Sequence, residues 1–199
     1  MAPTTSIRRN GFTLAESLVA MTILAISGSA LLLGVSSSLQ HAEHAREQTI
    51  ATGIAEQMID EVLGKLYMAP GGSPLQWPMS ANGWELAGDG RSRFDDTDDY
   101  HGYTAEGLEN IYGVPLGSGQ NGAGLRHENF QVREGYFDDW KQEFELYYVD
   151  EDNPQTRLPN GAVSYMRCVE VRISRKIEEN VYRNLVTMKR VFAYIPPPN

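Results

Sequence analysis

Residues 8–40 read RRNGFTLAESLVAMTILAISGSALLLGVSSSLQ, and this stretch decides how the chain is organised. From Ser17 to Gln40 it contains no Asp, Glu, Lys or Arg. About 20 predominantly apolar residues cross a bilayer as a helix, so the segment is long enough for one membrane span. Arg8 and Arg9 precede it. Because a positive flank stays in the cytoplasm, we expect the N-terminus there and the bulk of the chain on the other side.

The helical pattern continues beyond the apolar segment. Pairs of apolar residues recur every four positions from Ile50 to Tyr67, which is the stripe of an amphipathic helix packed on one face. The first proline after the span is Pro70, and it ends the pattern. We therefore expect one long helix, with residues 12–40 in the membrane and residues 41–69 on the periplasmic side.

Residues 70–199 have the pattern of a globular head. Residues 70–135 are rich in glycine and turn signals, which indicates loops. Alternating apolar and polar residues predict strands at 144–149, 166–174 and 185–194. Alternation of this kind is typical of an antiparallel sheet with one buried face. The predicted fold class is α+β, with the long N-terminal helix packed on an antiparallel β-sheet.

Composition excludes several classes of protein. The net charge is −9 and the isoelectric point is about 4.9, so nucleic acid is not expected as a partner, since binding phosphates needs clustered Lys and Arg. Cys168 is the only cysteine, which excludes a disulfide within the chain. The sequence shows no nucleophile elbow, no phosphate-binding loop and no zinc spacing, so no enzymatic activity is predicted.

Three tryptophans lie among the predicted loops, at positions 77, 84 and 140. We expect them to fill the core of the head, because large aromatic rings bury much apolar area. The alternative is an exposed platform for binding sugars.

The junction after Arg9 carries a specific combination of features. A short basic leader ends at Gly11, and Phe12 opens an apolar helix whose fifth residue is Glu16. This arrangement resembles the prepilin leader and cleavage motif of type IV pilins and of the pseudopilins of type II secretion. The resemblance implies that residues 1–11 are a leader removed by prepilin peptidase after Gly11. It further implies that Phe12 becomes an N-methylated terminus and that Glu16 serves filament assembly.

Glu16 is the unusual residue on physical grounds. A lone carboxylate in a membrane span costs about 2–3 kcal/mol even on lenient scales, so it needs a partner. The resemblance implies that this partner is the amine of Phe12, on its own chain or a neighbouring one. Two alternatives remain open: Glu16 lies at the membrane surface beside Arg9, or residues 1–30 form a secretory signal cleaved near residues 28–30.

A weaker resemblance concerns the subclass. The stretches Leu18–Ile26 and Thr49–Glu61 are similar to minor pilins of the V/I type, which are low-copy subunits of pili or of the type II secretion pseudopilus. Major pilins usually carry a helix-bending proline where this chain has Gly28 and Gly34, and they are commonly closed by a disulfide. The resemblance implies location in the inner membrane, followed by assembly into a filament. The implied partners are other pilin or pseudopilin subunits, prepilin peptidase, the inner-membrane assembly platform and membrane lipid.

An acidic run in the head is a candidate calcium site. It contains Asp95, Asp96, Asp98 and Asp99, and alternate oxygen ligands that end with the Tyr100 carbonyl suit a hard cation. The run lacks the glycine and glutamate that an EF-hand loop places at its sixth and twelfth positions. Some pseudopilins use calcium, and otherwise no cofactor is expected. The alternative is a solvated acidic loop.

Two functions of other classes remain open beside filament assembly. One is a calcium-dependent binding module displayed on the membrane anchor, and the other is a membrane-anchored enzyme with an unrecognised site. The sequence leaves open which machine the subunit serves.

Overall fold

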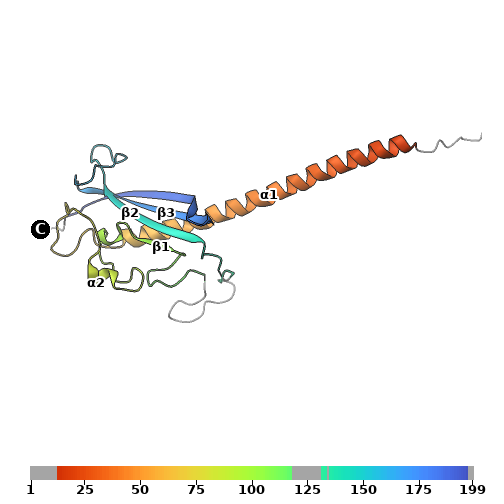
Figure 1. Cartoon of the computed structure of the whole chain (residues 1–199). Coiled ribbons are helices and arrows are strands. Elements are labelled where there is room, and N and C mark those ends of the chain that lie inside the picture. Colours follow the sequence, from red (N-terminus) through yellow and green to blue (C-terminus); the bar gives the residue numbers. More distant parts are fainter. Residues whose placement is uncertain (1–12, 118–130, 134, 197–199) are drawn as a thin grey trace, which may run out of the picture. The chain divides into compact units, whose positions relative to one another are not determined.

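The computed structural model describes residues 13–117, 131–133 and 135–196, which are coloured in Figure 1. The chain divides into two compact units, residues 1–46 and residues 47–199. Helix α1, Leu14–Leu63, begins in the first unit and ends in the second.

The described part of the first unit is the N-terminal part of α1. Its large apolar side chains are exposed, as Leu14 (82 %) and Leu32 (73 %) illustrate. The helix contains a window with a mean hydropathy of 2.3 and is long and apolar enough to cross a membrane. A surface of this kind is stable in contact with lipid or with other apolar helices.

The second unit is built on a four-stranded antiparallel sheet in the order β1-β2-β3-β4. The strands are β1 (Thr104–Glu106), β2 (Trp140–Tyr148), β3 (Met166–Glu178) and β4 (Val181–Ala193). Two short helical turns, α2 (Gly83–Leu86) and η1 (Asp98–Tyr100), lie in the loop region that was expected at residues 70–135. The predicted α+β class and the three predicted strands are confirmed, and the short edge strand β1 was not predicted.

The core lies between α1 and one face of the sheet. Alternate residues of β2 and β3 point toward the helix, so Phe144, Leu146, Val169, Val171 and Ile173 are all at most 2 % exposed. They pack in one cluster with the buried residues of α1, which are Ala51, Ala55, Met58, Ile59 and Val62. The periodicity of four predicted this stripe.

Helix α1 ends at Leu63, earlier than the predicted residue 69. The chain after Gly64 pairs with the acidic loop instead: the Leu66 N–H donates to the Asp95 carbonyl at 3.3 Å, and the Thr97 N–H donates to the Leu66 carbonyl at 2.9 Å. The apolar pair at the end of the pattern therefore lies outside the helix: Leu66 is exposed, and the Tyr67 ring contacts Phe192. Pairing with a distant segment overrides the helical pattern here.

The expectation for the tryptophans is confirmed only for Trp140, which is 0 % exposed. Trp84 is 64 % exposed and Trp77 is 41 % exposed, so the core assignment was wrong for both. The Trp84 ring lies 5.1 Å from the Arg93 guanidinium, and such a cation–π contact stabilises an aromatic ring at the surface.

Candidate functional site

The processing motif begins outside the described residues, because Gly11 and Phe12 precede Thr13. Glu16 is described and lies in the first turn of α1. Its carboxylate oxygen Oε2 accepts the Thr13 N–H at 2.9 Å and the Thr13 hydroxyl at 3.0 Å. The Glu16 N–H in turn donates to Thr13 Oγ1 at 3.3 Å. This reciprocal pattern is a capping box.

The capping box gives the Glu16 carboxylate a defined place at the start of the helix. Both bonds from Thr13 go to Oε2, and a carboxylate offers about four lone-pair sites on its two oxygens. The remaining sites keep acceptor capacity for a cation. The N-terminal end of a helix also favours a negative charge, because the peptide dipoles leave partial positive charge there.

The aspartates of the acidic run in the head make different interactions. Asp98 is 3 % exposed and pairs at 2.6 Å with Arg167, which is 0 % exposed. Arg167 also donates to Thr97 Oγ1 at 2.9 Å and to the Tyr148 hydroxyl at 3.0 Å. Burial raises the pKa of Asp98 to about 6, although the Arg167 charge opposes that shift. Asp98 thus joins the loop to strand β3.

Asp96 stabilises the turn of the loop itself. Its Oδ1 accepts the Asp98 N–H at 2.7 Å. Burial raises the pKa of the Asp96 carboxyl, and the neighbouring Asp95 charge adds to that rise. The carboxylates of Asp96 and Asp98 are therefore engaged inside the loop and with Arg167.

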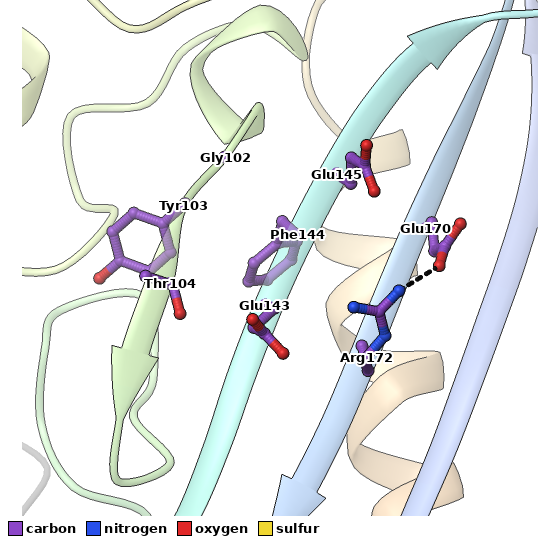
Figure 2. A pocket seen from close by; sticks show the side chains of 8 residues that line it. All are labelled: Gly102, Tyr103, Thr104, Glu143, Phe144, Glu145, Glu170 and Arg172. Atoms are coloured by element: carbon purple, nitrogen blue, oxygen red, sulfur yellow. Dashed lines mark hydrogen bonds and ion pairs between the residues drawn. The ribbon is translucent and has the colours of Figure 1, made fainter. Parts of the chain in front are cut away.

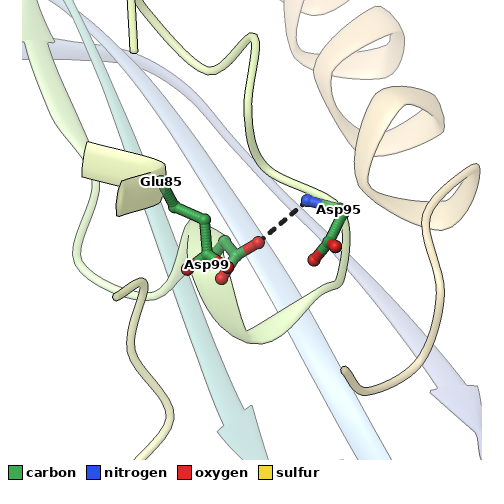
Figure 3. A group of neighbouring side chains, drawn as sticks. All are labelled: Glu85, Asp95 and Asp99. Atoms are coloured by element: carbon green, nitrogen blue, oxygen red, sulfur yellow. Dashed lines mark hydrogen bonds between the residues drawn. The ribbon is translucent and has the colours of Figure 1, made fainter. Parts of the chain in front are cut away.

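Asp95 and Asp99 come together with a third carboxylate, Glu85 (Figure 3). One oxygen of each lies within 4.8 Å of the others. Asp99 Oδ2 accepts the Asp95 N–H at 2.9 Å and the Asp96 N–H at 3.3 Å. Burial, together with the charge of Asp96, raises the pKa of Asp99 to about 7.

Three converging carboxylates supply part of a calcium site. Calcium takes 6–8 oxygen ligands, so carbonyl groups or water would have to complete the shell. Glu85 was not predicted as a ligand, because it lies ten positions before Asp95 and no spacing in the sequence connects them. It is held by a capping box in which the Asn82 N–H donates to Glu85 Oε2 at 2.5 Å.

Glu47 is another acidic residue of α1, and it is buried. No pattern in the sequence had singled it out. Arg183 of β4 donates to its Oε2 at 2.6 Å, and Arg175 of β3 pairs with its Oε1. Two arginines from the β3–β4 hairpin thus hold one helical carboxylate. A similar pair joins Glu61 of α1 to the buried Arg91 at 2.9 Å. These pairs fix the head on the helix.

A cavity of about 210 Å³ opens beside β1 and β2 (Figure 2). Three of the side chains that line it are carboxylates, and each of them pairs with a cation. Glu145 pairs with Arg157 at 2.5 Å, Glu170 with Arg172 at 2.9 Å, and Glu143 with Lys141 at 2.9 Å. Among the described residues that line this cavity, none is His, Cys or Ser. Its chemistry is that of a surface ion-pair network.

A comparison with protein families matches residues 7–32 to the prokaryotic N-terminal methylation motif. No curated protein and no solved structure matches the chain. The matched residues include the apolar start of helix α1, whose other end packs on a four-stranded antiparallel sheet. Together these features define a type IV pilin-like protein.

Within that class, the motif is that of pilins and pseudopilins, whose leader prepilin peptidase removes. It points to a structural subunit that assembles with other pilin subunits. Helix α1, the one helix of the described residues that is long and apolar enough to cross a membrane, is consistent with a membrane anchor.

Proposed function

We propose that this chain is a minor subunit of a type IV pilus or of a type II secretion pseudopilus. It is held in the inner membrane by residues 12–40, with its N-terminus in the cytoplasm and its head in the periplasm. Prepilin peptidase cleaves after Gly11 and methylates Phe12, and the assembly platform then moves the subunit from the membrane into a filament. The match of residues 7–32 to the methylation motif carries this proposal.

The minor role is supported by the composition of the helix and of the head. No proline interrupts α1 between Leu14 and Leu63. The only cysteine, Cys168, is buried as a free thiol, so no disulfide closes the head. An anchor helix without a proline and a head without a disulfide distinguish the chain from the usual major subunit.

Glu16 is proposed as the residue that sets the position of the subunit in the filament. In a low-dielectric bundle of spans, an unpaired carboxylate is costly, and pairing with the Phe12 amine of a neighbouring chain offsets that cost. The Thr13 capping box supports this role, because it orients the carboxylate and leaves acceptor sites for the amine.

The N-terminal residue and mass of the protein from host membranes test the processing step. We expect a chain that begins at N-methyl-Phe12. A chain that begins near residue 31 would instead indicate an exported protein without an anchor, and the filament proposal would fall.

The assembly step is tested with Glu16→Ala, and Glu43→Ala serves as the matched control because Glu43 is an exposed acid beyond the span. Both variants should be cleaved and methylated as the wild type is. Only Glu16→Ala should fail to appear in sheared filaments on immunoblots. Incorporation of Glu16→Ala at the wild-type level would contradict the role of Glu16.

A second candidate function is calcium binding by the head, which the convergence of Glu85, Asp95 and Asp99 favours. Asp96 and Asp98 then act as supports of the loop. Calcium at 100 times its Kd would stabilise the folded head by about 2.7 kcal/mol. The test is the melting temperature of residues 42–199 in EDTA, in calcium and in magnesium. A rise with calcium that Glu85→Gln abolishes supports the site, and equal melting temperatures in all three solutions contradict it.

A further inference from the structure

Strand β4 forms one edge of the sheet. It pairs along its length with β3, and in the three described ranges of the chain no strand pairs with its other side. None of its thirteen residues is buried, whereas seven of the first nine residues of β3 are. Long edge strands present unpaired backbone groups to solvent and are templates for another strand.

The register shows which backbone groups of β4 point outward. The Tyr194 N–H donates to the Tyr165 carbonyl at 2.8 Å, so this end of β4 directs that N–H toward β3. The pairing stays regular from Met166 to Ile173. Because backbone groups alternate in direction along an antiparallel strand, the N–H and C=O groups of Thr187, Lys189 and Val191 point away from β3.

Apolar side chains on both faces of β4 are incompletely covered. Val186, Met188 and Phe192 are only partly buried where they pack against the main core. Val191 packs, again partly buried, on the smaller cluster of the opposite face. An added strand would cover side chains on both faces, and cross-strand pairs of this kind stabilise a sheet.

The same edge carries surplus positive charge in an acidic protein. Arg175 and Arg183 both pair with Glu47. Glu170 is likewise shared by Arg172 and Lys189. The exposed residue 190 is a further arginine, and β4 itself contains no Asp or Glu. The chain as a whole has a net charge of −9.

We propose that β4 is the docking edge for an extended, acidic segment of a different filament subunit, which adds as a fifth strand when the filament assembles. Backbone pairing supplies the contact, and the surplus positive charge selects an acidic partner. Two copies of this chain joined through β4 would bring like charges together, so a second copy is disfavoured as the occupant. This inference rests on the proposed function, because the partner is another subunit.

Hydrogen–deuterium exchange of the full-length protein tests the added strand. Two states are compared, the chain in detergent-extracted membranes and filaments captured through a tag on this chain. Peptides covering β4 should exchange at least about tenfold more slowly at their outward-facing amides in the filament. Peptides from the interior strand β2 should be unchanged, which provides an internal control.

A pair of variants tests the same edge by incorporation. Thr187→Pro removes an outward N–H and no bond to β3, so the head should stay folded while strand addition is blocked. Thr187→Val is the matched control, since it keeps a β-branched side chain. We expect at least about a tenfold lower amount of Thr187→Pro in filaments relative to Thr187→Val. If the proline variant fails to fold, the hydrogen–deuterium exchange of the wild-type chain tests strand addition instead.

The possible outcomes separate the two proposals. Incorporation of the wild-type chain with unchanged exchange in β4 overturns strand addition and leaves the proposed function intact. Absence of the chain from filaments overturns the proposed function and this inference with it. If the outward-facing amides of β4 already exchange slowly in the purified chain, with no other subunit present, a second copy of this chain is the occupant. That result overturns the assignment of a different, acidic subunit.

Discussion

Replacing Glu47 by glutamine should weaken the attachment of the β3–β4 hairpin to α1. Glutamine keeps the size of the side chain but removes the charge that Arg175 and Arg183 share, and its amide NH₂ would face a guanidinium group. The head should therefore lose stability without a change of shape, because the substitution creates no cavity.

The magnitude follows from two charge-assisted hydrogen bonds. Each such bond contributes about 1.5–3 kcal/mol. The side chains of Arg175 and Arg183 are 33 % and 35 % exposed and can be hydrated again when Glu47 is lost. The low end of the range applies, which gives about 3 kcal/mol in total for the two bonds. For a unit of this size, that loss lowers the melting temperature by about 6–12 °C.

The assay is urea unfolding of residues 42–199, followed by circular dichroism, at pH 7 and moderate salt. Glu56→Gln is the matched control, because Glu56 is an exposed glutamate on the same helix, and its effect should stay within about 0.5 kcal/mol. A double-mutant cycle of Glu47→Gln with Arg175→Gln should show a coupling of at least about 1 kcal/mol. If Glu47→Gln unfolds at the same urea concentration as Glu56→Gln, the attachment reasoning is wrong.

Two further predictions concern the acidic loop and are checked on the same fragment in EDTA. The pKa of Asp99 is raised to about 7 and exceeds its value in the unfolded chain, so the folded head binds more protons than the unfolded chain between pH 4 and 7. The stability that this group contributes is therefore greatest below about pH 4 and declines as the pH rises toward 7. Asp99→Asn should flatten that decline. An unchanged pH profile in that variant would contradict the assignment. Arg167→Met should cost about 3–5 kcal/mol at pH 7.5, because it leaves the buried Asp98 carboxylate unpaired. The cost should shrink at pH 5, where Asp98 is protonated. The control Arg157→Met breaks the exposed pair with Glu145 and the cation–π contact with Tyr147, and it should cost at most about 2 kcal/mol at either pH.

The parts of this protein that the sequence predicted are those controlled by local pattern. The exposed apolar part of α1 follows from an uncharged segment, and the buried stripe of α1 follows from a four-residue period that continues as far as Val62. The strands β2, β3 and β4 follow from the alternation of apolar and polar residues. The motif around Gly11 and Glu16 is likewise a contiguous signal. In each case the residues that cause the structure are close in the chain.

The head required the tertiary structure wherever residues far apart in the chain meet. Helix α1 ends at Leu63, earlier than the predicted residue 69, because the chain that follows it pairs with the acidic loop. Glu85 joins Asp95 and Asp99 only because the fold brings two loops together.

The sequence by itself thus determined the class of protein, its long apolar helix and its methylation motif, since these depend on short periodic or contiguous patterns. Only the tertiary structure decided which charges are buried and what neutralises them. The pairing of Glu47 with the hairpin arginines and of Asp98 with Arg167 illustrates this. The physical reason is that the energy of an ion pair depends on distance and on burial, and neither quantity is encoded by separation along the chain.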